Sequence, residues 1–244
     1  MRIVAIEQVT PDPVRGAYRP WLSQRWRDVT FVHWRVRPAT VAPFLPAGTM
    51  PDTFDGVTYV GLIALRMVGV GPVRGPAVPY FGTFCETNVR IYAVDRRGRR
   101  SVVFLSMDAE RLVPVLAARA ALRLPYMWSA MRLAKDGDVV RYASRRRWPR
   151  PAAVNRMTVR VGTPIPDPTP EEHFLTARWA LHTPAWGRTL YLPSEHPRWP
   201  LHRAELLELN DTLLLSAGLP PPGPPDSVLH SPGVPAVFGP PTAL

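Results

Sequence analysis

With 244 residues, 46% of them hydrophobic, the chain can bury a sizeable core, and we predict one domain over residues 1–244. The single cysteine, Cys85, excludes an intramolecular disulfide framework and a cysteine-based metal cluster, and it favours a reducing compartment. The net charge of +11 comes almost entirely from arginine, because Lys135 is the only lysine. Such a charge is compatible with nucleic acid, an anionic membrane or an acidic ligand as partner.

The first predicted strands are rich in β-branched and aromatic residues. One covers residues 29–36, and the turn at Asp55-Gly56 precedes a nearly all-apolar strand over residues 57–68. Such a run is typical of a strand covered on both faces, so its one charge, Arg66, needs a buried partner and is a candidate for the interior. The run is too short to span a bilayer, and residues 1–13 lack the apolar core of a signal peptide. We therefore expect a cytoplasmic protein without membrane contact.

The strand that organises the chain covers residues 84–92 and alternates regularly. It places Glu86, Asn88, Arg90 and Tyr92 on one face, while the other face is mostly apolar. Because the flanking segments are apolar, this polar face is more typical of a cavity wall than of a solvated surface. We expect the face to line an enclosed pocket.

A strand, a helix and a second hairpin follow. Residues 101–108 form a strand that makes a first hairpin with residues 84–92, and Asp108 is the predicted N-cap of a helix over residues 109–123. The second hairpin joins residues 139–147 to residues 154–161, and seven arginines but no acidic residue occur between residues 139 and 166. This hairpin could hold phosphates, but it lacks the interleaved aromatic residues of a nucleic-acid site. We expect a solvated surface or one that faces another subunit, which leaves a homo-oligomer open.

The C-terminal third is predicted from shorter signals. Thr169, followed by proline and two glutamates, predicts a helix start, and Asn210 or Asp211 can cap a final helix that ends at Gly218. We expect the proline-rich segment 219–244 to pack on the domain and to contain an edge strand over residues 234–239. The predicted fold class is α+β and β-dominated, with two or three short helices. A curved antiparallel sheet closes into a cone or barrel around a cavity.

The polar face of residues 84–92 has two interpretations. Glu86, Asn88 and Arg90 could form a carboxylate held by an arginine, an arrangement that sets the pKa of an acid or base, or they could form a buried structural ion pair. Cys85 points away from them and has no partner histidine, which favours a packed thiol over a nucleophile. The histidines lack metal-ligand spacing, so we predict neither a metal site nor a cofactor.

Several motifs in a fixed order resemble one family. They are F-L-P-A-G from Phe44, D-T-F-D-G from Asp52, F-C-E-T-N-V-R-I-Y from Phe84, L-P-Y from Leu124 and T-A-R-W from Thr176. Together they resemble the YqjF-like domain-of-unknown-function family over nearly the whole chain. That family is similar, more distantly, to acetoacetate decarboxylase. The resemblance implies a curved antiparallel β-sheet wrapped into a cone around an apolar cavity.

The same resemblance implies altered chemistry. In the decarboxylase family a strand glutamate lies near a lysine that follows a proline, and that lysine forms a Schiff base with a keto acid. Glu86 matches the glutamate, but Tyr126 follows Pro125 where that family has lysine. Lys135 lies beside a predicted turn, where a desolvated amine of low pKa is not expected.

We therefore expect a pocket for a small carboxylate or carbonyl compound. Asn88, Arg90, Tyr126 and Arg66 are the candidate binding residues, and Glu86 is the candidate acid or base. The enzyme hypothesis is a lyase or related activity that forms no imine. The alternatives are a non-catalytic ligand-binding or structural protein, and a nucleic-acid-binding protein that uses the arginine hairpin.

Overall fold

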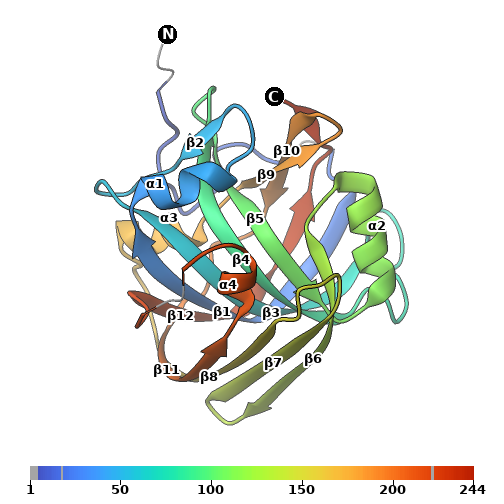
Figure 1. The fold of residues 1–244 in the computed structure, drawn as a ribbon, viewed down its shortest axis with the longest axis vertical. Coiled ribbons are helices and arrows are strands. Elements are labelled where there is room, and N and C mark those ends of the chain that lie inside the picture. Colours follow the sequence, from blue (N-terminus) through green and yellow to red (C-terminus); the bar gives the residue numbers. More distant parts are fainter. Residues whose placement is uncertain (1–4, 18, 221–222) are drawn as a thin grey trace.

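A computed structural model describes residues 5–17, 19–220 and 223–244 (Figure 1). The strands are β1 (Leu22–Val36), β2 (Thr49–Pro51), β3 (Thr58–Pro72), β4 (Phe84–Asp95), β5 (Arg100–Ala109), β6 (Tyr126–Asp136), β7 (Val139–Trp148), β8 (Val154–Pro164), β9 (Ala180–Ala185), β10 (Arg188–Glu195), β11 (His202–Asp211), β12 (Ser227–Phe238) and β13 (Thr242–Ala243). The helices are α1 (Pro38–Val41), α2 (Leu112–Leu122), α3 (Pro170–Thr176) and α4 (Leu213–Ser216), and Ala42–Phe44 form a 3-10 turn. The prediction of a β-dominated fold is confirmed, with four helices where two or three were expected.

All 13 strands belong to one sheet, whose order is β13-β10-β9-β5-β6-β7-β8-β11-β12-β1-β3-β4-β2. Two further pairings, β4 with β5 and β10 with β12, connect strands that are distant in this order. The sheet therefore returns on itself and is ring-like. Most pairs are antiparallel, but β5 pairs in parallel with β6 and with β9.

Two hydrophobic cores lie on the two faces of the long strands β1, β3 and β4. On β3, Ile63 and Leu65 belong to one core, whereas Leu62 and Ala64 belong to the other. We call the first the inner core; it also contains the rings of Phe31, Tyr59, Tyr92 and Phe174. This arrangement explains the nearly all-apolar sequence of β3, because a strand covered on both faces has no solvated side to mark with polar residues.

Local signals at the helix ends succeed for α3 and fail for α2. The Thr169 hydroxyl accepts a hydrogen bond from the backbone N–H of Glu172, whose carboxylate accepts one from the backbone N–H of Thr169, so the predicted capping box is confirmed. Helix α2 begins only at Leu112, and its N-cap residue Arg111 makes no side-chain cap. The prediction of Asp108 as N-cap is wrong, because Asp108 stays in β5 and pairs with Arg146.

The predicted C-terminal edge strand is instead the inner strand β12. It pairs with β1 along most of its length, with β11 only at Leu229 and His230, and with β10 only at Val237 and Phe238. Pro232 and Pro235 fall between these two short pairings, where β12 has a neighbour on one side only. A proline lacks a backbone donor, so this stretch tolerates it although the strand is internal. Among the helices of the described residues, none is long and apolar enough to cross a membrane.

Candidate functional site

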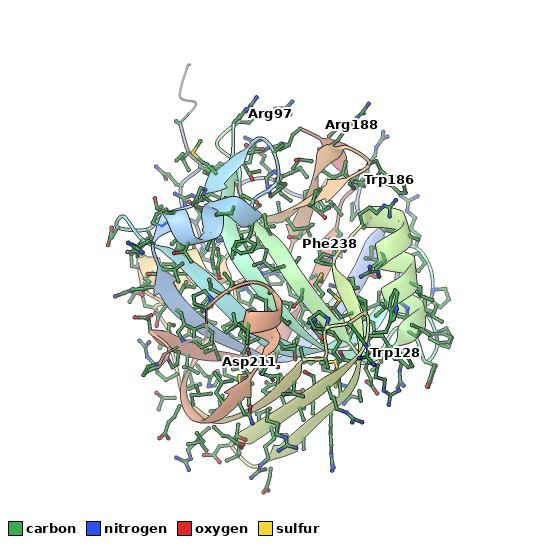
Figure 2. The ribbon with its side chains drawn as sticks, in the orientation of Figure 1. Arg97, Trp128, Trp186, Arg188, Asp211 and Phe238 are labelled. Carbon is green, nitrogen blue, oxygen red and sulfur yellow. The ribbon has the colours of Figure 1, made fainter. Side chains whose placement is uncertain are left out.

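The polar face of β4 points into the inner core. Glu86, Asn88, Arg90 and Tyr92 are at most 9% exposed, and they share this face with Phe84. Side chains project from the strands of the ring throughout the molecule (Figure 2). The alternation read from the sequence thus places the four polar residues on one buried face.

Glu86 is held by two donors. The Asn88 amide donates to one carboxylate oxygen at 3.0 Å, and the Tyr126 hydroxyl donates to the other at 2.9 Å. Burial raises the pKa of the Glu86 carboxyl to about 7, although both hydrogen bonds act in the opposite direction. Burial also keeps the pKa of Tyr126 well above its usual value, so this hydroxyl remains a donor at neutral pH.

Asn88 can serve both protonation states of Glu86. Its Oδ1 atom is buried and has no hydrogen-bond partner among the described residues. If the amide rotates by half a turn, Oδ1 can accept a hydrogen bond from a protonated Glu86, whereas in the present orientation the NH₂ group donates to the carboxylate. The pair is therefore suited to a carboxyl group that gains and loses a proton near neutral pH.

Arg90 does not pair with Glu86. Its Nη2 donates to the carbonyl oxygen of Leu175 at 2.7 Å, and its Nε donates to the Tyr92 hydroxyl at 3.3 Å. The predicted Glu86–Arg90 ion pair is wrong because residues four apart on a strand are separated by about 13 Å, so each polar residue bonds to the one two positions away. Arg90 Nη1 makes no hydrogen bond to the described residues.

Arg66 does not reach the interior, so its predicted place there is wrong. Leu62, Ala64 and Arg66 lie on the same face of β3, but the second core ends at Ala64, and Arg66 is exposed. Strand β1 also shifts its register with β3 between Arg27 and Thr30, next to this point. The side chain therefore lies just past the edge of the core that covers its face.

A second polar group in the inner core was not predicted as part of the site. His33 Nε2 lies 2.7 Å from the Tyr92 hydroxyl, which donates to the Leu175 carbonyl at 2.8 Å. Arg178 donates to Asp52 at 2.5 Å, and its guanidinium lies over the ring of Tyr92. The only sequence signal for this role of Asp52 is its place in the D-T-F-D-G motif.

Aromatic rings surround the far end of this group. Trp26 stacks on Trp199 with ring centroids 5.5 Å apart, and the ring centroids of His196 and Trp179 are 4.4 Å apart. Burial lowers the pKa of His196 to about 4, so this ring is neutral at pH 7. The indole N–H groups of Trp26 and Trp179 are buried and have no partner among the described residues.

Cys85 is on the opposite face of β4, as the alternation predicts. Burial raises the pKa of its thiol to about 11, which keeps it protonated at neutral pH. Within the part of the chain that the structure describes, no group of three or more His, Cys, Asp or Glu side chains could hold a metal ion. Neither of two surface pockets is lined by Glu86, Asn88 or Tyr126.

Residues 23–235 match the model of the DUF2071 family, described as "Uncharacterized conserved protein". The chain belongs to the DUF2071 family. It is 29% identical over 185 residues to the uncharacterized protein YqjF of Bacillus subtilis strain 168, an alignment that covers 75% of this chain and 76% of YqjF.

Solved structures show the fold that this DUF2071 chain shares. An acetoacetate decarboxylase-like enzyme from Sphingomonas wittichii RW1 matches with a TM-score of 0.63 and 16% identity over 99% of both chains. The enduracididine biosynthesis enzyme MppR, solved with pyruvate, matches with a TM-score of 0.63 and 17% identity over 92% of this chain and 90% of MppR. Acetoacetate decarboxylase from Legionella pneumophila matches with a TM-score of 0.60 and 14% identity over 100% of this chain and 98% of that chain. The DUF2071 chain therefore has an acetoacetate decarboxylase-like fold.

The DUF2071 chain has no lysine near Glu86. Tyr126 occupies the position after Pro125, and its hydroxyl bonds to Glu86. Lys135 lies at the other end of β6, where its side chain is 50% exposed and donates to Asp28 at 3.3 Å. An exposed, ion-paired lysine at the end of a strand lacks the buried apolar setting that activates a Schiff-base amine.

Proposed function

We propose that this protein binds a small carbonyl or carboxylate compound in the inner core and that Glu86 exchanges a proton with it. The observation that carries the proposal is the buried Glu86 carboxyl, whose pKa is raised to about 7 between Tyr126 and Asn88. A general base is most effective when its pKa lies near the working pH. The reaction class that fits is removal of a proton from a carbon next to a carbonyl group.

The proton transfer needs no partner beyond the residues named. The Glu86 carboxylate takes the proton. The electron pair of the C–H bond forms a C=C bond while the carbonyl π electrons move to oxygen, which gives the enolate of the substrate. The same proton, or one from solvent, returns to the carbon from Glu86 and restores the carbonyl compound. Arg90 has an Nη1 group without a hydrogen bond to the described residues, and it is the candidate partner for a substrate carboxylate.

Several buried polar atoms support a ligand or water in this core. His33 Nδ1, Asn88 Oδ1, Trp26 Nε1 and Trp179 Nε1 have no hydrogen-bond partner among the described residues. Leaving such groups unpaired costs free energy, and native proteins usually satisfy them with protein, water or ligand. The MppR structure holds pyruvate in a similar fold, so pyruvate is a reasonable first probe.

We expect the protein to exchange the methyl protons of pyruvate in D₂O, at a rate that rises as the pH passes through about 7 and Glu86 loses its proton. Loss of signal from the methyl group in ¹H NMR measures the rate. Glu86→Gln should lower it by about 10²- to 10⁴-fold, since the base is gone. Glu205→Gln, at an exposed carboxylate, is the matched control.

Two outcomes would contradict this proposal. Equal exchange rates for the wild type and Glu86→Gln would remove Glu86 from the reaction. Binding of pyruvate without exchange would instead favour the non-catalytic ligand-binding alternative.

We further expect no imine between this protein and a keto acid. Borohydride reduction in the presence of acetoacetate should leave the mass of the Lys135 peptide unchanged, because this amine is exposed, pairs with Asp28 and lies far from the candidate site at the other end of β6. Mass spectrometry of the digested protein separates this peptide from the N-terminal one, whose α-amino group can react on its own. A reduced adduct on Lys135 would show that this lysine forms an imine with the keto acid, and it would contradict the prediction.

A further inference from the structure

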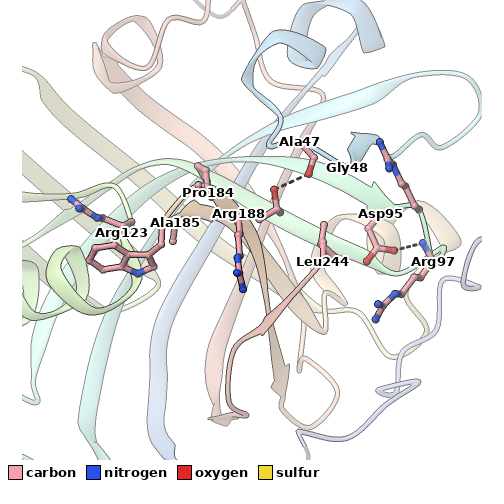
Figure 3. A pocket seen from close by; sticks show the side chains of 13 residues that line it. Ala47, Gly48, Asp95, Arg97, Arg123, Pro184, Ala185, Arg188 and Leu244 are labelled. Carbon is pink, nitrogen blue, oxygen red and sulfur yellow. Dashed lines mark hydrogen bonds between the residues drawn. The ribbon is translucent and has the colours of Figure 1, made fainter.

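A surface pocket of about 890 Å³ opens where several turns of the chain meet (Figure 3). The turn between β4 and β5 contributes Arg96 and Arg97, and the hairpin between β9 and β10 contributes Trp186 and Arg188. Arg123, directly after α2, completes the basic residues of the lining. The pocket shares no lining residue with the group around Glu86, so it is a separate site.

The pocket carries unbalanced positive charge. Arg96, Arg97, Arg123 and Arg188 make no ion pair with a described acidic residue. The acidic side chain of the lining, Asp95, is already bound: it accepts hydrogen bonds from Arg99 Nε at 2.7 Å and from the backbone N–H groups of Arg97 and Arg99 at 2.8 and 3.0 Å. The four guanidinium groups are therefore available to an anion from solution.

Trp186 is placed at this pocket in an unusual conformation. It is 62% exposed and occupies the first position of a two-residue turn, with φ of 55°, and Gly187 follows with φ of 73°. Such turns favour asparagine, aspartate or glycine, because positive φ is unfavourable for a bulky side chain. Arg123 also has a positive φ, of 54°, and its guanidinium lies 4.3 Å from the Trp186 ring centroid. Arg123 ends α2 in the left-handed conformation that is common at helix C-termini, so the strain in this exposed stack lies at Trp186, and such strain is concentrated at functional sites.

We propose that this pocket binds a ligand that carries phosphate groups and a planar ring, of which a nucleoside diphosphate is the chemical type. Arginine matches phosphate oxygens with paired N–H donors, and an exposed indole or guanidinium plane stacks on a planar ring. Arg188 lies between Arg123 and Arg97 in Figure 3, and Figure 2 shows Arg97, Arg188 and Trp186 at one end of the molecule. The ring packs against Trp186 and Arg123, and the phosphates lie at Arg188 and Arg97. The volume is within the usual range for small-molecule sites.

Titration calorimetry with ADP on the full chain, at constant ionic strength, tests this assignment. We expect saturable binding at one site and an affinity at least about 10-fold lower for Arg188→Ala, the loss typical of a charge-assisted hydrogen bond. Trp186→Gly should weaken binding to a similar degree while the protein stays folded, because glycine suits the positive φ of this turn. Arg74→Ala removes the same charge from an exposed loop outside the pocket and is the matched control.

Separate titrations with adenosine and pyrophosphate measure the ring contact and the phosphate contact individually. Each of these compounds should bind more weakly than ADP. The absence of saturable ADP binding would overturn the proposal, and so would equal weakening by Arg74→Ala and Arg188→Ala, since that result means general charge attraction. Unchanged affinity of Trp186→Gly would overturn the ring contact. Glu86→Gln should bind ADP as the wild type does, so failure of this proposal is separate from failure of the proton-exchange function.

Discussion

Replacing Arg146 by methionine is expected to lower the free energy of unfolding by roughly 3 to 5 kcal/mol. Arg146 Nε and Nη2 donate to the two carboxylate oxygens of Asp108 at 2.9 and 2.7 Å, and the two side chains are 2% and 0% exposed. Among the described residues, the one other hydrogen bond to this carboxylate comes from the Ser129 hydroxyl. Without the arginine, a buried negative charge would lose its counter-charge, which costs more than the ion pair itself contributes.

The double variant Asp108→Asn, Arg146→Met should recover much of this loss, because the uncompensated charge is gone. Denaturant unfolding of the single and double variants measures the coupling. Arg160→Met is the matched control in the same hairpin: its side chain is 50% exposed and pairs with the exposed Glu205, so we expect a change within about 1 kcal/mol. A loss in Arg146→Met no greater than in Arg160→Met would mean that the buried pair does not hold β5 against β7.

The alternation of β4 could be predicted because it is a local property of the chain. Side chains two apart on a strand share a face, whatever the rest of the fold does, so the sequence places Glu86, Asn88, Arg90 and Tyr92 together. The capping box at Thr169 is local in the same sense. The meeting of Tyr126 with Glu86 depends on the pairing of β5 with β6, and only the resemblance to a known family indicated it.

The partners of charged residues could not be predicted in this way. Asp108 has the residue type and position of a helix cap, but its partner Arg146 lies 38 residues further along the chain. Arg146 itself looked like one member of a solvated arginine hairpin. Arg66 looked buried because its neighbours along β3 are apolar, and the point where the second core ends is not visible in the strand itself. In each case the outcome depends on segments that are distant in the sequence.

Glu86→Gln is expected to become more stable relative to the wild type as the pH rises. Burial raises the pKa of Glu86 from its ordinary value of 4.5 to about 7, so the folded protein keeps a proton that the unfolded chain releases. Between these two values the folded state binds more protons, and stability falls as the pH increases. Above about pH 7 the full cost of the buried charge, roughly 3 kcal/mol, is present in the wild type.

Glutamine removes this titration and can keep the contacts of the site, since Asn88 Oδ1 can accept from its NH₂ group once the Asn88 amide rotates by half a turn, and Tyr126 can donate to its oxygen. The difference in unfolding free energy between Glu86→Gln and the wild type should therefore shift by roughly 3 kcal/mol in favour of the variant from pH 4.5 to pH 8. Other titrating groups, such as His196, are common to both proteins and cancel in this difference. Urea unfolding across this range measures it, with Glu205→Gln, at an exposed carboxylate, as the matched control. A difference that stays constant with pH would mean that Glu86 ionises at its ordinary pKa, and the case for a base poised near neutral pH would be lost.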